Sequence, residues 1–195
     1  WLLSLNRKNK YYIFSMFVQT QNTPNPNSLK FLPSKEVSND DPFEITDKNK
    51  SDNELVKNIL SINGVTGIFL AKNFLSVNKD EKTNWEDLKH IIISFINDYY
   101  GNGNEIVIDS NKITSPETQL SEIEKKITKI LETKIRPAVA RDGGDIKFKK
   151  YNNGIVTVQL QGSCSGCPSS IMTLKQGVQN LLCHYIPEIK EVVTN

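Results

Sequence analysis

Apolar and polar residues alternate in several short stretches of the first half of the chain, which is the period of a half-buried β-strand. Two longer stretches there place apolar residues three and four positions apart, which is the period of an amphipathic helix. This pattern predicts strands at 17–20, 28–32, 65–70, 74–77 and 105–108, and helices at 54–62 and 84–100. The polar stretch 33–53 is predicted to be a loop.

The second half of the chain has its own order of elements. A helix is expected at 117–135 and is predicted to break at Arg136-Pro137, because proline removes a helical hydrogen bond. Two alternating strands follow around Asn152-Asn153-Gly154, a hairpin turn signal. The strands are predicted at 145–149 and 155–160, a further helix at 169–185, and a last strand at 189–193.

The fold class predicted from this order is α+β, with two small domains that each pair a short sheet with two or so helices. The polar segment 109–116 ends in a serine and a proline, a helix N-cap followed by a residue suited to the first helical position. We therefore predict a linker at 109–116, between domains at 16–108 and 117–195.

Residues 1–15 stand apart from this pattern. They include Arg7, Lys8 and Lys10 without an acidic residue, as in a leader that targets a protein to an organelle. The alternative is a wrongly assigned start, and we favour it because Met16 opens a clean strand pattern.

Composition narrows the function classes. The 195 residues carry 24 basic and 22 acidic side chains, a net charge of +2, with no clustered basic face of the kind that binds nucleic acid. No apolar run approaches the roughly 18 residues of a membrane span. Three cysteines are an odd number for a disulfide framework. A reducing compartment is therefore expected, the bacterial cytoplasm first and the mitochondrial matrix as the alternative.

The segment of the chain that most clearly indicates a chemical function is Cys164-Ser165-Gly166-Cys167-Pro168. It lies between a predicted strand and a predicted helix, so both thiols belong to a loop that can present them to one soft metal. Gly162 and Gly166 allow tight turns, and proline suits the first helical position. The positive end of the helix dipole is expected to favour thiolate over thiol at Cys164 and Cys167.

Three chemistries remain open for this pair. Iron–sulfur clusters use thiolates, typically four, and a dimer could also supply a tetrahedral zinc site. Thioredoxin-like disulfide exchange also uses C-x-x-C at a helix start, but the repeated βαβ order of that fold is missing. Cys183 lies near the far end of the helix, on the order of 20 Å away, so four thiolates need two chains.

The remaining candidates have plain structural interpretations beside functional ones. The glycines of 142–145 predict a tight turn, in which Asp145 starts a strand and Asp142 caps backbone N–H groups. Arg136 either balances the charge of a cluster or is solvated surface. The exposed loop Thr23-Pro24-Asn25-Pro26 is either a partner contact or an ordinary turn. We find neither a nucleophile–base pair nor a phosphate loop, so no enzyme activity and no catalytic residue is predicted.

The runs R-P-A-V-A-R-D-G-G-D at 136–145 and L-Q-G-S-C-S-G-C-P-S-S at 160–170 closely resemble the C-terminal domain of NifU. The segment T-P-N-P-N-S-L-K-F at 23–31, with Trp85, is similar to the N-terminal domain of Nfu proteins. The resemblance covers about 16–195. It implies assembly of 4Fe–4S clusters held by Cys164 and Cys167 between two subunits. It also implies delivery to apo iron–sulfur proteins, downstream of other cluster assembly proteins, without nucleic acid or membrane partners.

Overall fold

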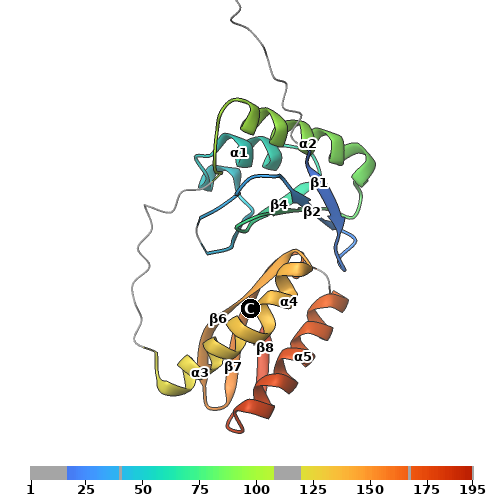
Figure 1. The fold of residues 1–195 in the computed structure, drawn as a ribbon. Coiled ribbons are helices and arrows are strands. Elements are labelled where there is room, and N and C mark those ends of the chain that lie inside the picture. The colour runs from blue at the N-terminus through green and yellow to red at the C-terminus, as the bar shows by residue number, and fades with distance from the viewer. Residues whose placement is uncertain (1–16, 40, 108–119, 167, 195) are drawn as a thin grey trace, which may run out of the picture.

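The computed structural model describes residues 17–39, 41–107, 120–166 and 168–194. Within them two sheets, each with its own helices and its own apolar core, form two small domains (Figure 1). The predicted α+β class with two small domains is confirmed. The predicted leader at 1–15 and the linker at 109–116 lie outside the described residues, so the domain boundaries stay predictions.

The N-terminal domain is built on a five-stranded sheet with the order β1-β2-β5-β4-β3, in which all neighbours are antiparallel. The strands are β1 (Gln19–Asn22), β2 (Ser28–Leu32), β3 (Phe43–Ile45), β4 (Val65–Leu70) and β5 (Leu75–Lys79). Strands β4 and β5 lie close to the strands that the alternation predicted at 65–70 and 74–77, and they pair as an antiparallel hairpin.

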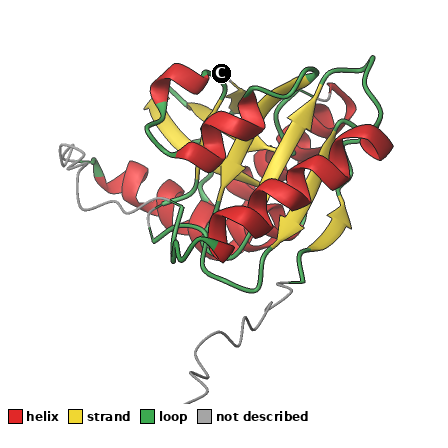
Figure 2. Cartoon of the chain, turned by 90° about the horizontal axis from the view of Figure 1, so that it is seen from above, coloured by secondary structure: helices red, strands yellow, loops and turns green. Residues whose placement is uncertain are grey.

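Two helices cover one face of this sheet, as Figures 1 and 2 show. They are α1 (Glu54–Leu60) and α2 (Trp85–Gly101). Asn53 caps α1, because its side chain accepts a hydrogen bond from the backbone of Val56. Alternate strand residues and one stripe of each helix form the core, whose fully buried members include Phe31, Ile59, Ile68, Leu70, Leu75, Ile92 and Ile96.

Two predictions for this domain were wrong in part. The predicted loop 33–53 contains β3 and the short 3₁₀ helix η1 (Lys48–Lys50). A three-residue strand is too short to show a period of two, so only its pairing with β4 reveals it. Residues 105–107 of the predicted strand at 105–108 form no strand, although Val107 donates a backbone hydrogen bond to Val37 at 3.0 Å. Residue 108 lies outside the described residues.

The C-terminal domain opens with helix α3 (Glu122–Ile130), which Ser121 and Glu124 cap by reciprocal hydrogen bonds. The predicted break at Arg136-Pro137 was wrong, because the chain remains helical. A π-helical turn, η2 (Leu131–Ile135), leads directly into α4 (Arg136–Arg141). The wider turn lets the N–H of Arg136 reach the carbonyl of Leu131, and the proline stands in the first turn of α4, where its missing N–H is tolerated.

Three strands form the second sheet, in the order β6-β7-β8. Strands β6 (Gly144–Asn152) and β7 (Ile155–Gly162) make the predicted hairpin, in which Asn153 and Gly154 both have positive φ. Strand β8 (Glu191–Thr194) runs parallel to β7 after helix α5 (Pro168–Tyr185). Neither α5 nor any other helix of the described residues is long and apolar enough to cross a membrane.

The second face of the N-terminal sheet lies against the C-terminal domain (Figure 1). A small apolar cluster of Phe69, Ala71 and Phe74 is buried there, with Ala140 of α4 packed against it. Polar contacts surround this cluster. They extend to the segment that contains Cys164, the first of the two predicted metal ligands. The two domains therefore meet at the candidate site.

Candidate functional site

The candidate site is the loop between β7 and α5. We call its described part, residues 162–166, the cysteine loop. Gly162 and Gly166 have φ of 66° and 80°, a left-handed conformation that favours glycine. The turn is closed by a hydrogen bond from the N–H of Ser165 to the carbonyl of Gly162 at 3.1 Å. Cys167, the second predicted ligand, lies outside the described residues.

Cys164 is buried in the described structure, with 8% of its surface exposed. Burial raises the pKa of the Cys164 thiol to about 11, against a weaker opposing hydrogen bond between Cys164 and Ser163, and the nearby charges of Asp142 and Asp145 add to the rise. The expectation that the helix dipole favours thiolate was therefore wrong for Cys164 in this conformation. The residue precedes the first residue of α5 by four positions, and removal from water is the main cause of its raised pKa.

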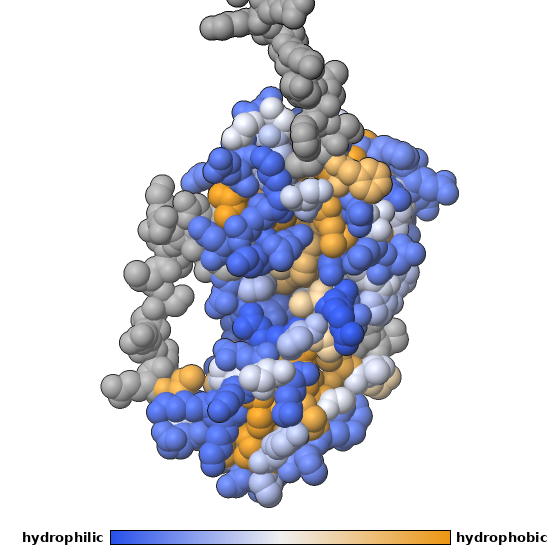
Figure 3. Space-filling view, viewed as in Figure 1, coloured by the Kyte–Doolittle hydropathy of each residue, from blue (hydrophilic) through white to orange (hydrophobic). Residues whose placement is uncertain are grey.

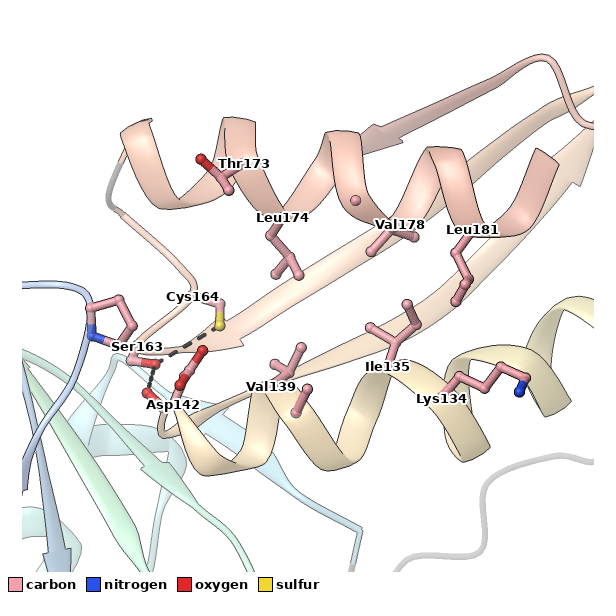
Figure 4. Close-up of a pocket in the computed structure, with 13 residues that line it drawn as sticks. Lys134, Ile135, Val139, Asp142, Ser163, Cys164, Thr173, Leu174, Val178 and Leu181 are labelled. Carbon is pink, nitrogen blue, oxygen red and sulfur yellow. Dashed lines mark hydrogen bonds between the residues drawn. The ribbon is translucent and has the colours of Figure 1, made fainter. Parts of the chain in front are cut away.

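The Cys164 side chain faces an apolar groove between helices α4 and α5 (Figure 4). The groove has a volume of about 660 Å³. Figure 3 shows the apolar strip that it forms on this face of the C-terminal domain. Its apolar walls come from Ile135, Ala138, Val139, Leu174, Val178 and Leu181, and Pro24 of the N-terminal domain also lines it.

An ion pair holds the turn that supports this end of the groove. Arg136 Nε donates to Asp145 Oδ1 at 2.8 Å and Arg136 Nη2 donates to Asp145 Oδ2 at 3.0 Å. The Asp145 side chain is 4% exposed, and this pairing raises the pKa of Arg136 further above its usual range. The Arg136 guanidinium is thus paired with Asp145 and is not simply solvated at the surface. Asp142 ends α4, and its backbone carbonyl accepts a hydrogen bond from Ser163 Oγ.

Replacing Arg136 with alanine is expected to lower the free energy of unfolding by about 2 kcal/mol, because it leaves the buried Asp145 carboxylate without its partner. The arginine is itself 25% exposed, which keeps the effect below that of a fully buried pair. Urea unfolding followed by circular dichroism measures it. The exposed Arg141→Ala change is the control and should stay within about 0.5 kcal/mol. Equal effects of the two changes would contradict a structural ion pair.

Asn25 belongs to the site, although the sequence did not single it out. The loop that contains it was expected to be exposed, yet Asn25 is 3% exposed. Its Nδ2 donates to the backbone carbonyls of Ser163 at 3.1 Å and Ser165 at 3.2 Å. The only signal in the sequence is the rigid frame of two prolines around the asparagine, which fixes its position without indicating what it contacts.

Cys183 lies near the other end of α5 and is half-buried. Its Sγ lies 3.2 Å from the carbonyl oxygen of Ile189, and the side chain packs against the C-terminal core. Cys183 therefore has a packing role in this domain. Within the described residues no three His, Cys, Asp or Glu side chains gather as metal ligands would.

Both halves of the chain match known families. Residues 18–103 match the family described as scaffold protein Nfu/NifU N terminal, and residues 127–193 match the NifU-like domain. The chain therefore belongs to the Nfu/NifU family, as the resemblance implied.

Individual relatives share most of this chain. It is 40% identical over 185 residues to "NifU-like protein 4, mitochondrial" of Arabidopsis thaliana, a match that covers 91% of this chain and 65% of that protein. It is 42% identical over 187 residues to "NFU1 iron-sulfur cluster scaffold homolog, mitochondrial" of Drosophila ananassae, which covers 91% and 64%. The chain thus spans slightly less than two thirds of the length of these curated relatives.

Among solved structures, the chain is similar to a NifU-like protein from Saccharomyces cerevisiae determined in solution by NMR. The sequence identity is 27% and the TM-score is 0.44, with coverage of 49% of this chain and 87% of that one.

Proposed function

We propose that this chain is an iron–sulfur cluster scaffold and carrier. Cys164 and Cys167 of each of two copies bind one 4Fe–4S cluster, and the dimer passes it to apo iron–sulfur proteins. The observation that carries the proposal is Cys164 on a glycine-turned loop, inside the segment 127–193 that matches the NifU-like domain. The relatives from Drosophila are named as iron–sulfur cluster scaffolds, which supports the same cargo.

The second copy follows from the number of thiolates. A 4Fe–4S cluster takes about four cysteine ligands, and this chain has three cysteines. Cys183 lies near the opposite end of α5, and 16 residues of helix correspond to roughly 24 Å. Two C-x-x-C pairs, one from each copy, complete the set. A cluster that is bound between two copies is released when the copies separate, which suits a carrier.

Anaerobic reconstitution with iron and sulfide, followed by iron and sulfide analysis and a Mössbauer spectrum, tests the proposal. The expected product is a 4Fe–4S cluster that activates an apo-aconitase. Preferential binding of zinc with no cluster would contradict it, as would insulin reduction by the metal-free protein in the absence of transfer.

Cluster binding is expected to convert monomers into dimers, because a ligand that binds only to the dimer favours association by mass action. Sedimentation velocity should show a cluster-free monomer and, after loading, a dimer with one cluster per two chains. An iron chelator should reverse the change. One intact cluster on a monomer in thiol-free buffer would contradict the bridging arrangement.

For its cellular site we propose the mitochondrial matrix, the alternative that the sequence left open beside the bacterial cytoplasm. The relatives from Arabidopsis and Drosophila are named as mitochondrial proteins. The recipients in that compartment are apo-proteins that need a 4Fe–4S cluster, and upstream assembly proteins supply it. The role is that of a carrier, with no catalytic residue assigned.

A further inference from the structure

The polar face of the N-terminal sheet holds the cysteine loop by its backbone. Three side chains, which we call the loop clamp, are Asn25, Ser76 and Asn78. Asn25 Nδ2 donates to two carbonyls of the loop, as described above. Asn78 Nδ2 donates to the carbonyl of Gly162 at 3.1 Å, and Ser76 Oγ donates to the carbonyl of Gly143 at 2.7 Å. The loop is thus held on both sides of Cys164 and at the neighbouring turn.

Further contacts strengthen the same junction. Lys30, which is 7% exposed, donates through Nζ to the carbonyls of Ala140 at 3.1 Å and Arg141 at 3.3 Å, at the negative end of α4. Ser165 Oγ donates to Glu44 Oε1 at 3.0 Å. Most of these bonds are accepted by main-chain carbonyls, so the sheet recognises one conformation of the loop rather than its side chains.

The clamp is itself fixed in place. Asn25 Oδ1 accepts a hydrogen bond from the N–H of Asn27 at 2.9 Å, which leaves Nδ2 directed at the cysteine loop. Trp85 Nε1 donates to the carbonyl of Pro26 at 2.9 Å and ties the segment to α2. Asn25 therefore acts as a rigid part of the N-terminal domain, and the cysteine loop cannot turn without breaking its bonds to that domain.

The held conformation buries the thiol. Cys164 is 8% exposed, and a methyl group added at Gly144 would lie 2.7 Å from its Sγ, which shows how closely the turn surrounds it. A cysteine that binds a cluster shared by two copies has to be accessible to the second copy. We propose that the loop clamp holds the cysteine loop in a closed state, and that cluster loading requires the two domains to separate.

The closed state rests on these hydrogen bonds and on the burial of Cys164, and only its link to loading rests on the proposed function. Asn25→Asp together with Asn78→Asp is the sharpest change, since aspartate has nearly the shape of asparagine. At Asn25 it keeps the oxygen that accepts from Asn27 but places a second oxygen against two carbonyls. At Asn78 it places a carboxylate against Glu44, which Asn78 now contacts at 3.1 Å.

Asn27→Asp is the matched control. It adds the same charge as Asn25→Asp alone in the same segment, and its Oδ1 acceptor for Lys79 Nζ is retained. Cys167→Ser and Cys183→Ser are introduced in every chain, so that only Cys164 reacts with iodoacetamide. The measurement is the alkylation rate of the full, cluster-free chain, followed by mass spectrometry.

The double aspartate variant should react at least roughly tenfold faster than its parent, because it loses several hydrogen bonds that favour the closed state. Each single variant should show a smaller increase, and Asn27→Asp should match the parent. Far-UV circular dichroism confirms that each chain is folded, and the single variants serve if the double variant is not. Rates within twofold of the parent in folded variants would overturn the closed state.

Loading is tested separately in chains with all native cysteines. The clamp variants should acquire the absorbance of a cluster faster than the parent during anaerobic reconstitution. Slower loading together with faster alkylation would overturn the requirement for separation, because the docked arrangement would then be the one that accepts the cluster. Failure of every chain, the parent included, to bind a cluster would contradict the proposed function, while the alkylation result would still decide the closed state.

Discussion

Replacing Cys164 with serine is expected to abolish the visible absorbance of the reconstituted protein. A serine hydroxyl is a far weaker ligand for iron than a thiolate, and a cluster between two copies loses two of its about four ligands at once. Cys167→Ser should have the same effect for the same reason. The loss is therefore expected to be nearly complete rather than partial.

Cys183→Ser is the matched control for this result. Its thiol lies near the other end of α5, where it contacts Ile189, so the serine variant should keep the full cluster content. Absorbance spectra and iron analysis of the three variants, reconstituted side by side, provide the comparison. Loss of iron from Cys183→Ser alone would reverse the assignment of ligands.

Much of the fold could be predicted because local patterns and tertiary structure agree. The alternation in β5, β6 and β7 matches the faces that the two cores bury. The turn at Asn153-Gly154 requires two residues with positive φ, and the sequence supplies residues that tolerate it. Such elements carry their own signal, so their existence and pairing follow from the sequence.

Elements that depend on distant contacts were missed. Strand β3 is only three residues long and is defined by its partner β4. The π turn before Pro137 arises because the helix continues along the groove, whereas the proline alone predicted a break. In both cases tertiary packing overrides the local preference.

The candidate site was likewise predicted only in part from the sequence. The spacing of Cys164 and Cys167 and the flanking glycines identified the loop, because those residue types are uncommon in that order. Ser76 and Asn78 lie at the polar positions of a strand, which ordinarily face water. Here that face contacts a second domain, and only the arrangement of the two domains reveals that it binds the cysteine loop.

Gly144 is a position at which a single methyl group should severely disturb this site. A Cβ there would lie 2.6 Å from the carbonyl oxygen of Gln161 and 2.7 Å from Cys164 Sγ, both far inside van der Waals contact. Gly144 is paired with Gly162 in the β6–β7 ladder, so the backbone has little freedom to retreat. The strain can be relieved only if the end of the hairpin or the cysteine loop moves.

Gly144→Ala is therefore expected to lower the free energy of unfolding by about 3 kcal/mol and to reduce the cluster content of the reconstituted protein severely. Gly177→Ala, in α5 beside the same groove, is the control, because a Cβ there meets nothing within 4 Å. That change should instead stabilise the helix by about 0.5–1 kcal/mol and leave loading intact. Thermal unfolding and iron analysis measure both effects. If Gly144→Ala melted at the temperature of the unchanged protein with full cluster content, the close packing of the turn around Cys164 would be wrong.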